Sequence, residues 1–154
     1  MVTSIAAKVS ITVFSRKDND FCGYVRNDYL KVGCGFENSW EMISILESMF
    51  NKLSFPQSFV TDKRFSNKNK NKREINFKDI GEEMTNKEKK AKAKFIVSVQ
   101  YRQNATWQGT IQWVEKNKSQ NFRSTLELLK LMDEAIAEGE DGNEAKVSFE
   151  NDEE

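Results

Sequence analysis

The sequence predicts an α+β protein in which one antiparallel sheet, or two adjoining sheets, carries two helices on one face. Three observations support this class. Apolar and polar residues alternate over residues 8–16 and 94–102, which is typical of half-buried strands. Apolar residues then recur at helical spacing after residues 38 and 124. The two regions also align with each other, without a gap, at an offset of 86 residues.

This internal alignment indicates a duplicated unit, a β-hairpin with a possible third strand followed by a helix. The offset places Gly23 on Gly109 and Phe36 on Phe122, and it matches apolar with apolar positions along both copies. One copy of about 45 residues is too small to bury a stable core alone. We therefore expect the two copies to form one domain with a pseudo-twofold axis between them.

The first copy, with a proline-containing extension, occupies residues 1–60. Its first strand buries Val9, Ile11 and Val13, and Asn27-Asp28 predicts a turn. The helix is expected to begin near Asn38, and its glutamate three residues later completes a capping pattern. The predicted inner stripe of this helix consists of Trp40, Ile43, Leu46, Phe50 and Leu53.

The second copy occupies residues 94–138 and repeats the same pattern. Trp107 and Trp113 share one side of a strand with Ile111, so we assign both tryptophans to the core. A turn is expected at Lys116-Asn117, and Ser124 with Glu127 forms a capping box at the start of the helix. The predicted inner stripe here consists of Leu126, Leu129, Met132 and Ile136.

The charged residues are balanced in number but separated along the chain. Lys plus Arg and Asp plus Glu each number 24. Residues 61–94 contain twelve basic and six acidic residues, whereas residues 133–154 contain one basic and ten acidic residues. We expect residues 61–93 to be a basic, polar, flexible linker and residues 139–154 to be a disordered acidic tail.

The amino-acid composition excludes several kinds of catalytic and metal site. The sequence has no histidine and two cysteines, which excludes histidine-based triads, histidine metal sites and a four-thiolate zinc site. Cys22 and Cys34 are interpreted as reduced sheet residues, with a redox pair as the less favoured alternative. No apolar run is long enough to span a membrane, and the first residues do not have the form of a signal peptide. We expect a non-catalytic protein without a cofactor or metal.

The polar face of the predicted sheet is the first candidate binding surface. Arg16 and Arg102 recur at the same position of the two copies, at the end of the first strand. Amides, arginines and a tyrosine on an open sheet suit a protein strand or a single-stranded nucleic acid. The candidate residues are Arg16, Tyr24, Arg26, Arg102, Asn104, Gln108, Gln112 and Arg123.

A basic loop within the linker is the second candidate. Six positive charges and no acidic residue lie within residues 63–73. Such a segment either solubilises a linker or contacts phosphates with release of counterions. The loop residues are Lys63, Arg64, Lys68, Lys70, Lys72 and Arg73.

Two segments resemble known families. Asn104-x-Thr106-x-x-Gly109 resembles the N-x-S-x-x-G element of PilZ domains, a resemblance that implies cyclic di-GMP binding. The first copy has aspartates in place of the amide and hydroxyl, and an upstream R-x-x-x-R is missing. The stretch from Tyr101 to Trp113, followed by 121–128, resembles small uncharacterised proteins of clostridial-type Firmicutes. That resemblance implies a bacterial, cytoplasmic protein and transfers no catalytic residue.

Together these patterns predict an interaction protein. We expect a protein partner or a second copy of the chain to bind the polar sheet face or the cleft between the two copies. A nucleic-acid-binding module that uses the basic loop with the strand arginines is the alternative, and a PilZ-like nucleotide site is a remote one.

Overall fold

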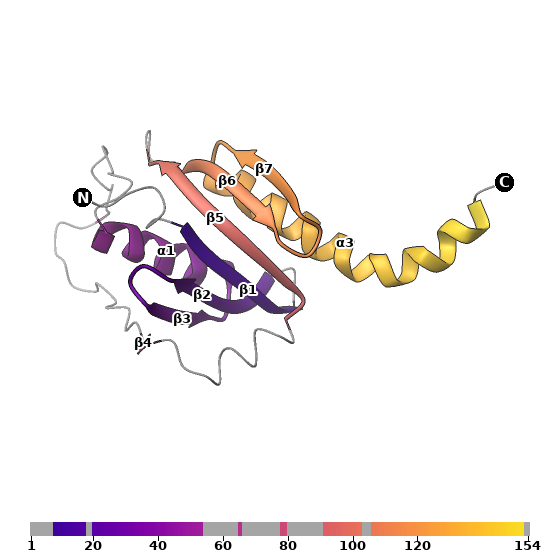
Figure 1. The fold of residues 1–154 in the computed structure, drawn as a ribbon, viewed down its shortest axis with the longest axis horizontal. Coiled ribbons are helices and arrows are strands. Elements are labelled where there is room, and N and C mark those ends of the chain that lie inside the picture. Colours follow the sequence, from indigo (N-terminus) through magenta and orange to yellow (C-terminus); the bar gives the residue numbers. More distant parts are fainter. Residues whose placement is uncertain are drawn as a thin grey trace.

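The protein has an α+β fold with one antiparallel sheet, as predicted (Figure 1). The structure is a computed structural model that describes residues 8–17, 20–53, 65, 78–79, 91–102 and 106–152, with the backbone alone for 17, 78–79 and 140–152. In these ranges the strand order is β4-β3-β2-β1-β5-β6-β7. The strands are β1 (Lys8–Lys17), β2 (Asp20–Asn27), β3 (Val32–Phe36), β4 (Lys78–Asp79), β5 (Ala93–Tyr101), β6 (Gln108–Trp113) and β7 (Lys118–Phe122).

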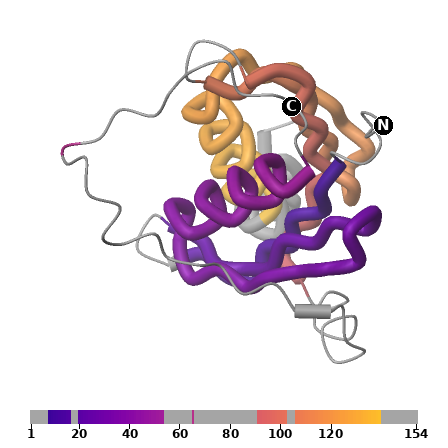
Figure 2. Tube along the Cα trace, turned by 90° about the vertical axis from the view of Figure 1, so that its left-hand side faces the viewer, coloured from indigo at the N-terminus to yellow at the C-terminus, as the bar shows by residue number. Residues whose placement is uncertain are grey.

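Two helices lie on the same side of the sheet, as Figure 2 shows. Helix α1 (Ser39–Leu53) contacts β2 and β3, whereas helix α3 (Thr125–Asp152) contacts β5, β6 and β7. The core between helices and sheet includes Phe50, Phe95 and Phe122, each almost fully buried. Trp107 and Trp113 are also buried there, which confirms their assignment to the core. Each helix therefore covers one half of the sheet, and β1 pairs with β5 where the halves meet.

The pairing registers of the two halves coincide at the offset of 86 residues. Ser10 pairs with Arg26 in the first half, and Ile96 pairs with Gln112 in the second. The pairs between β2 and β3 recur in the same way between β6 and β7. Each half has a bulge at the same place, because β1 and β5 each contribute one extra residue.

The turns and helix starts agree with the sequence patterns. Lys31 and Asn117, which lie 86 residues apart, are the non-glycine residues with positive φ among those described, at 54° and 49°. The Glu41 backbone N–H donates to Asn38 Oδ1 at 2.8 Å, and the Glu127 N–H donates to Ser124 Oγ at 3.1 Å. Both glutamate side chains accept a hydrogen bond from the residue before the cap. The expected capping role of these glutamates is confirmed.

Two expected core residues are instead exposed. Trp40 and Leu126 are 73% and 61% exposed, so the predicted inner stripes were wrong at their first positions. Helix α1 instead buries a stripe that begins at Met42, and helix α3 buries one that begins at Leu128. Both exposed residues lie in the first helical turn, on the side of the helix that points away from the buried stripe.

The structure describes the expected linker and tail only in part. Helix α3 continues to Asp152, and its C-terminal part extends beyond the sheet (Figure 1). The expected disorder of residues 139–154 stays a prediction. Within the expected linker, β4 pairs with β3 through Asp79 and Lys78, and most other residues of the linker lie outside the described ranges.

Candidate functional site

Arg16 and Arg102 were expected on the polar face of the sheet, which is the face opposite the two helices and is called the open face below. The structure places both arginines on the helix side instead. The bulge explains the difference, because the extra residue in β1 changes which side the following residues face. Arg16 therefore stands opposite Phe21 in β2, and Phe21 belongs to the core. Simple alternation along the strand, without the bulge, placed both arginines on the wrong face.

Each arginine contacts the helix of the other half. An Arg16 guanidinium nitrogen lies 2.9 Å from Asp133 Oδ1 in α3. Arg102 Nη1 donates to Asn51 Oδ1 in α1 at 2.8 Å, and its guanidinium carbon lies 5.7 Å from the centre of the Phe50 ring. The Arg102 side chain is 95% buried, since 5% of the residue is exposed. Both arginines therefore contact the opposite half of the molecule, and neither offers a free cation to a ligand on the open face.

The remaining candidates on the open face do not converge. Tyr24 is buried, and its hydroxyl occupies the space above Gly33. Arg26 Nε lies 2.9 Å from Asp28 Oδ1 on the same half of the sheet. Gln108 and Gln112 project from β6, which is separated from β2 by β1 and β5, a span of about 14 Å at the usual strand spacing. The open face therefore lacks a single site built from these side chains.

The other candidates divide between an exposed position and undescribed segments. Arg123 is largely exposed and pairs with Glu127 on α3 at 3.3 Å. Gln112 Nε2 donates to Asn117 Oδ1 at 3.3 Å. Asn104 of the PilZ-like pattern lies outside the described residues, as do the basic-loop residues Lys63, Arg64, Lys68, Lys70, Lys72 and Arg73.

The cysteines lie on opposite sides of the sheet. Cys34 pairs with the core residue Val25, so its side chain faces the helices. Cys22 follows the core residue Phe21, so its side chain faces the open side, and its sulfur lies 2.8 Å from Ser15 Oγ. No group of three or more His, Cys, Asp and Glu residues in the described ranges is placed to hold a metal ion.

This arrangement makes a clear prediction for oxidation. Two cysteines whose Cβ atoms point to opposite faces cannot form a disulfide without a change of backbone. Treatment of the folded protein with oxidised glutathione should leave Cys22 and Cys34 unbridged, as measured by intact mass after alkylation. A Cys22–Cys34 peptide pair linked by sulfur in the digested protein would contradict the observed register.

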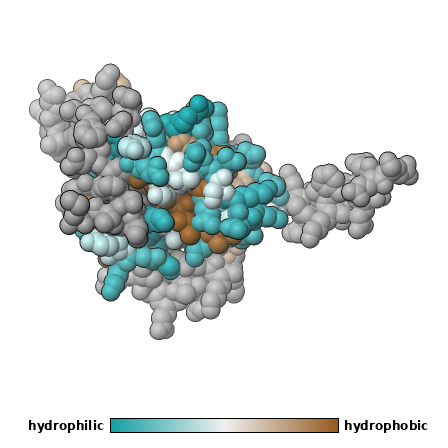
Figure 3. All heavy atoms as spheres, turned by 45° about the horizontal axis from the view of Figure 1, so that its top comes forward, coloured by the Kyte–Doolittle hydropathy of each residue, from teal (hydrophilic) through white to brown (hydrophobic). Residues whose placement is uncertain are grey.

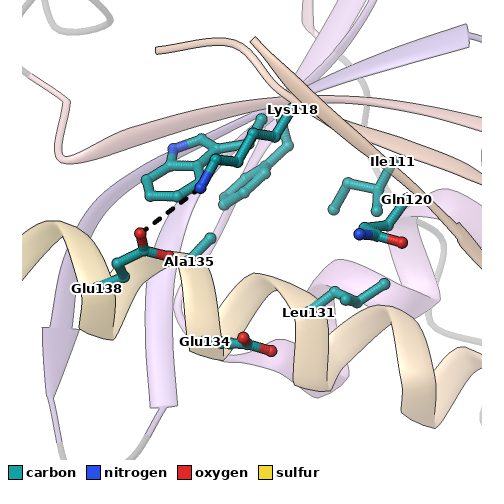
Figure 4. A pocket seen from close by; sticks show the side chains of 9 residues that line it. Ile111, Lys118, Gln120, Leu131, Glu134, Ala135 and Glu138 are labelled. Carbon is teal, nitrogen blue, oxygen red and sulfur yellow. Dashed lines mark ion pairs between the residues drawn. The ribbon is translucent and has the colours of Figure 1, made fainter. Parts of the chain in front are cut away.

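An open cleft lies between α3 and the second half of the sheet. Its volume is about 230 Å³, and Figure 4 shows side chains from β6, β7 and α3 around it. The apolar lining residues are Phe95, Ile111, Trp113, Leu131 and Ala135. Cavities of this kind, with an apolar floor and a few polar groups, are the usual places where proteins bind ligands.

The rim of the cleft is polar and charged. Lys118 Nζ lies 3.8 Å from Glu138 Oε1, and both side chains are more than half exposed (Figure 4). Gln120 and Glu134 complete the rim. The Trp113 indole Nε1 is buried and has no hydrogen-bond partner within the part of the chain that the structure describes. Figure 3 turns the β6–β7 side of Figure 1 toward the reader and shows a hydrophobic area surrounded by hydrophilic residues.

The outer strand of this half, β7, directs some of its backbone groups away from β6, toward a side without a described strand. The Val114 N–H donates to the Lys94 carbonyl of β5 at 3.0 Å, so the alternate residues of β6 direct their backbone groups toward β7. Trp113, Ile111 and Gly109 thus bond to their partners in β7. The N–H and C=O groups of Ser119 and Asn121 point to the free side, where no described strand pairs with β7. Sequence patterns alone did not reveal this edge or the cleft.

The comparisons with known proteins identify no relative. No protein-family model, no curated protein and no solved structure matches the chain. Within the described residues, neither α1 nor α3 has an apolar stretch of the length that crossing a bilayer requires. The β7 edge and the cleft beside it are therefore the features of the structure that bear on function.

Proposed function

We propose that the protein is a non-catalytic interaction protein that binds a protein partner by adding the partner's strand to β7. The proposal rests mainly on the outer edge of β7, where the N–H and C=O groups of Ser119 and Asn121 face no described strand and lie directly beside an open cleft. Strand addition supplies affinity through main-chain hydrogen bonds and specificity through pockets for alternate side chains. Lys118 and Gln120 belong to both features, because they are β7 residues that line the cleft.

The character of β7 suits a short, specific partner strand. Five residues form β7, and four of them are exposed polar residues. Short edge strands with a lysine resist open-ended aggregation. The opposite edge of the sheet differs, because β4 pairs there with β3. A partner strand is therefore proposed for the β7 edge and not for the β4 edge.

We further infer that the two halves are copies of one unit related by a pseudo-twofold axis, which passes between β1 and β5 where Ser10 pairs with Ile96. Equal pairing registers, equal bulges and equal helix caps at the offset of 86 residues support this inference. Two unrelated segments would have to acquire the same registers, bulges and caps at one common offset, so a duplication explains the agreement better than chance does. A bacterial, cytoplasmic setting is part of the proposal, and the resemblance of the stretch from Tyr101 to Trp113 supports it.

The test uses a random peptide library displayed on phage and selected on the immobilised full-length protein. We expect the enriched peptides to bind the Ser119→Pro variant about 10-fold more weakly than the wild type, because a 10-fold loss of affinity corresponds to about one lost hydrogen bond. Proline removes the outward N–H of Ser119 and no bond to β6, so the thermal unfolding midpoint should change little. Affinity is measured by calorimetry.

Two control variants separate the backbone from other effects. Ser119→Ala keeps the N–H and removes the hydroxyl, so peptide affinity should remain that of the wild type. Gln120→Pro removes a bond to β6 and should lower the unfolding midpoint. Equal peptide affinity of the wild type and Ser119→Pro would refute strand addition at β7, as would a selection that enriches no peptide.

A further inference from the structure

The two halves differ at the place where the cleft lies. The position of Ala135 in α3 corresponds, 86 residues earlier, to Met49 in α1, which is fully buried against the sheet. Lys118 and Gln120 of β7 correspond to Val32 and Cys34 of β3, which pack against the core. The first half thus fills this interface with its own side chains, whereas the second half leaves it open with a polar rim.

We propose that the cleft receives one large, unbranched apolar side chain, of the kind of methionine, from the partner strand bound at β7. The inference rests on the proposed strand addition and specifies what the partner contributes. Met49 indicates the occupant, because the same interface in the first half is closed by that side chain. An apolar cavity of about 150 Å³ is known to accept benzene, so the cleft has room for such a group.

The polar groups around the cleft fit a peptide. Alternate side chains of a strand beside β7 point toward the helix side, on which the Lys118 and Gln120 side chains lie (Figure 4). The ion pair between Lys118 and Glu138 is long and exposed, so opening it costs little. The indole N–H of Trp113, which is one of the residues lining the cleft, is buried and has no acceptor among the described residues.

The side chain's fit is tested with a probe that does not depend on strand addition. N-acetyl-methionine methylamide is titrated into the ¹⁵N-labelled full-length protein, and the indole N–H signal of Trp113 is followed after its assignment with Trp113→Phe. We expect the chemical shift of this signal to change and to saturate at millimolar probe concentrations, which is the affinity usual for a fragment of this size. N-acetyl-alanine methylamide should produce a much smaller shift, because it lacks the long side chain.

A filled cleft provides the matched variant. Ala135→Met should abolish the shift and weaken the selected peptides at least about 10-fold, whereas Ala137→Met adds the same side chain two residues away and should change neither. If N-acetyl-methionine methylamide causes no saturable shift, or the alanine probe acts equally, the inference is refuted.

The outcomes also separate the inference from strand addition. Peptides weakened by Ser119→Pro and unaffected by Ala135→Met would refute the side-chain site and leave strand addition intact. Peptides weakened by Ala135→Met and unaffected by Ser119→Pro would support the side-chain site and refute strand addition. Peptides unaffected by both variants would refute both.

Discussion

Replacement of Gly109 by alanine is expected to destabilise the protein by at least about 3 kcal/mol. A Cβ atom at this position would lie 2.0 Å from the carbonyl oxygen of Ser98, which is backbone and cannot move aside as a side-chain end can. Gly23 has the same problem, since its Cβ would lie 1.9 Å from the Thr12 carbonyl oxygen. The measurement is the free energy of unfolding from urea denaturation.

Gly23 and Gly109 lie opposite the bulges, so replacing either glycine should change the structure of the bulge as well as the stability. The extra residue of each bulge brings a strand carbonyl onto the neighbouring strand, and glycine is the residue that leaves room for it. Without the bulge, Arg16 and Arg102 would face the wrong side of the sheet. Gly109→Ala should therefore also disturb the contact of Arg102 with Asn51.

Gly35→Ala is the matched control within the same sheet. Its Cβ would meet its nearest neighbour, the Gly23 carbonyl oxygen, at 3.7 Å, which is ordinary contact. We expect its free energy of unfolding to stay within about 1 kcal/mol of the wild-type value. Similar losses for Gly35→Ala and Gly109→Ala would show that the close approach at the bulge is not what requires glycine.

Sequence patterns correctly predicted those strands and helix ends whose side-chain directions depend only on neighbouring residues in the chain. Alternation identified Val9, Ile11 and Val13 as core residues, and the capping patterns placed the helix starts at Asn38 and Ser124. These predictions succeed because side-chain alternation and cap hydrogen bonds are local properties of a strand or a helix end. The class of fold followed from the order of these elements.

The site required information that one strand does not contain. The bulge reversed the faces of Arg16 and Arg102, and it arises from pairing between two strands. The cleft depends on how α3 lies over the sheet, although the change from Met49 to Ala135 in the internal alignment is a signal that could have indicated it. The free edge of β7 depends on strand order, which sequence patterns did not settle.

The two arginines should differ strongly when each is replaced by alanine, although they occupy corresponding positions. Arg102→Ala is expected to cost about 2 to 4 kcal/mol, because it removes the partly buried hydrogen bond to Asn51 and the contact with the Phe50 ring, and it leaves a cavity where the buried side chain was. Arg16→Ala should cost less than about 1 kcal/mol, because Asp133 is half exposed and water replaces the ion pair.

Double-mutant cycles assign these costs to the named pairs. The cycle of Arg102 with Asn51, both replaced by alanine, should give a coupling energy of about 1 to 2 kcal/mol, and about 1 M NaCl should leave it unchanged because Asn51 is neutral. The cycle of Arg16 with Asp133 should give about 0.5 kcal/mol, and the same salt should remove most of it. If the coupling energy of Arg16 with Asp133 were larger than that of Arg102 with Asn51, burial would not be what makes one of these two contacts stronger than the other.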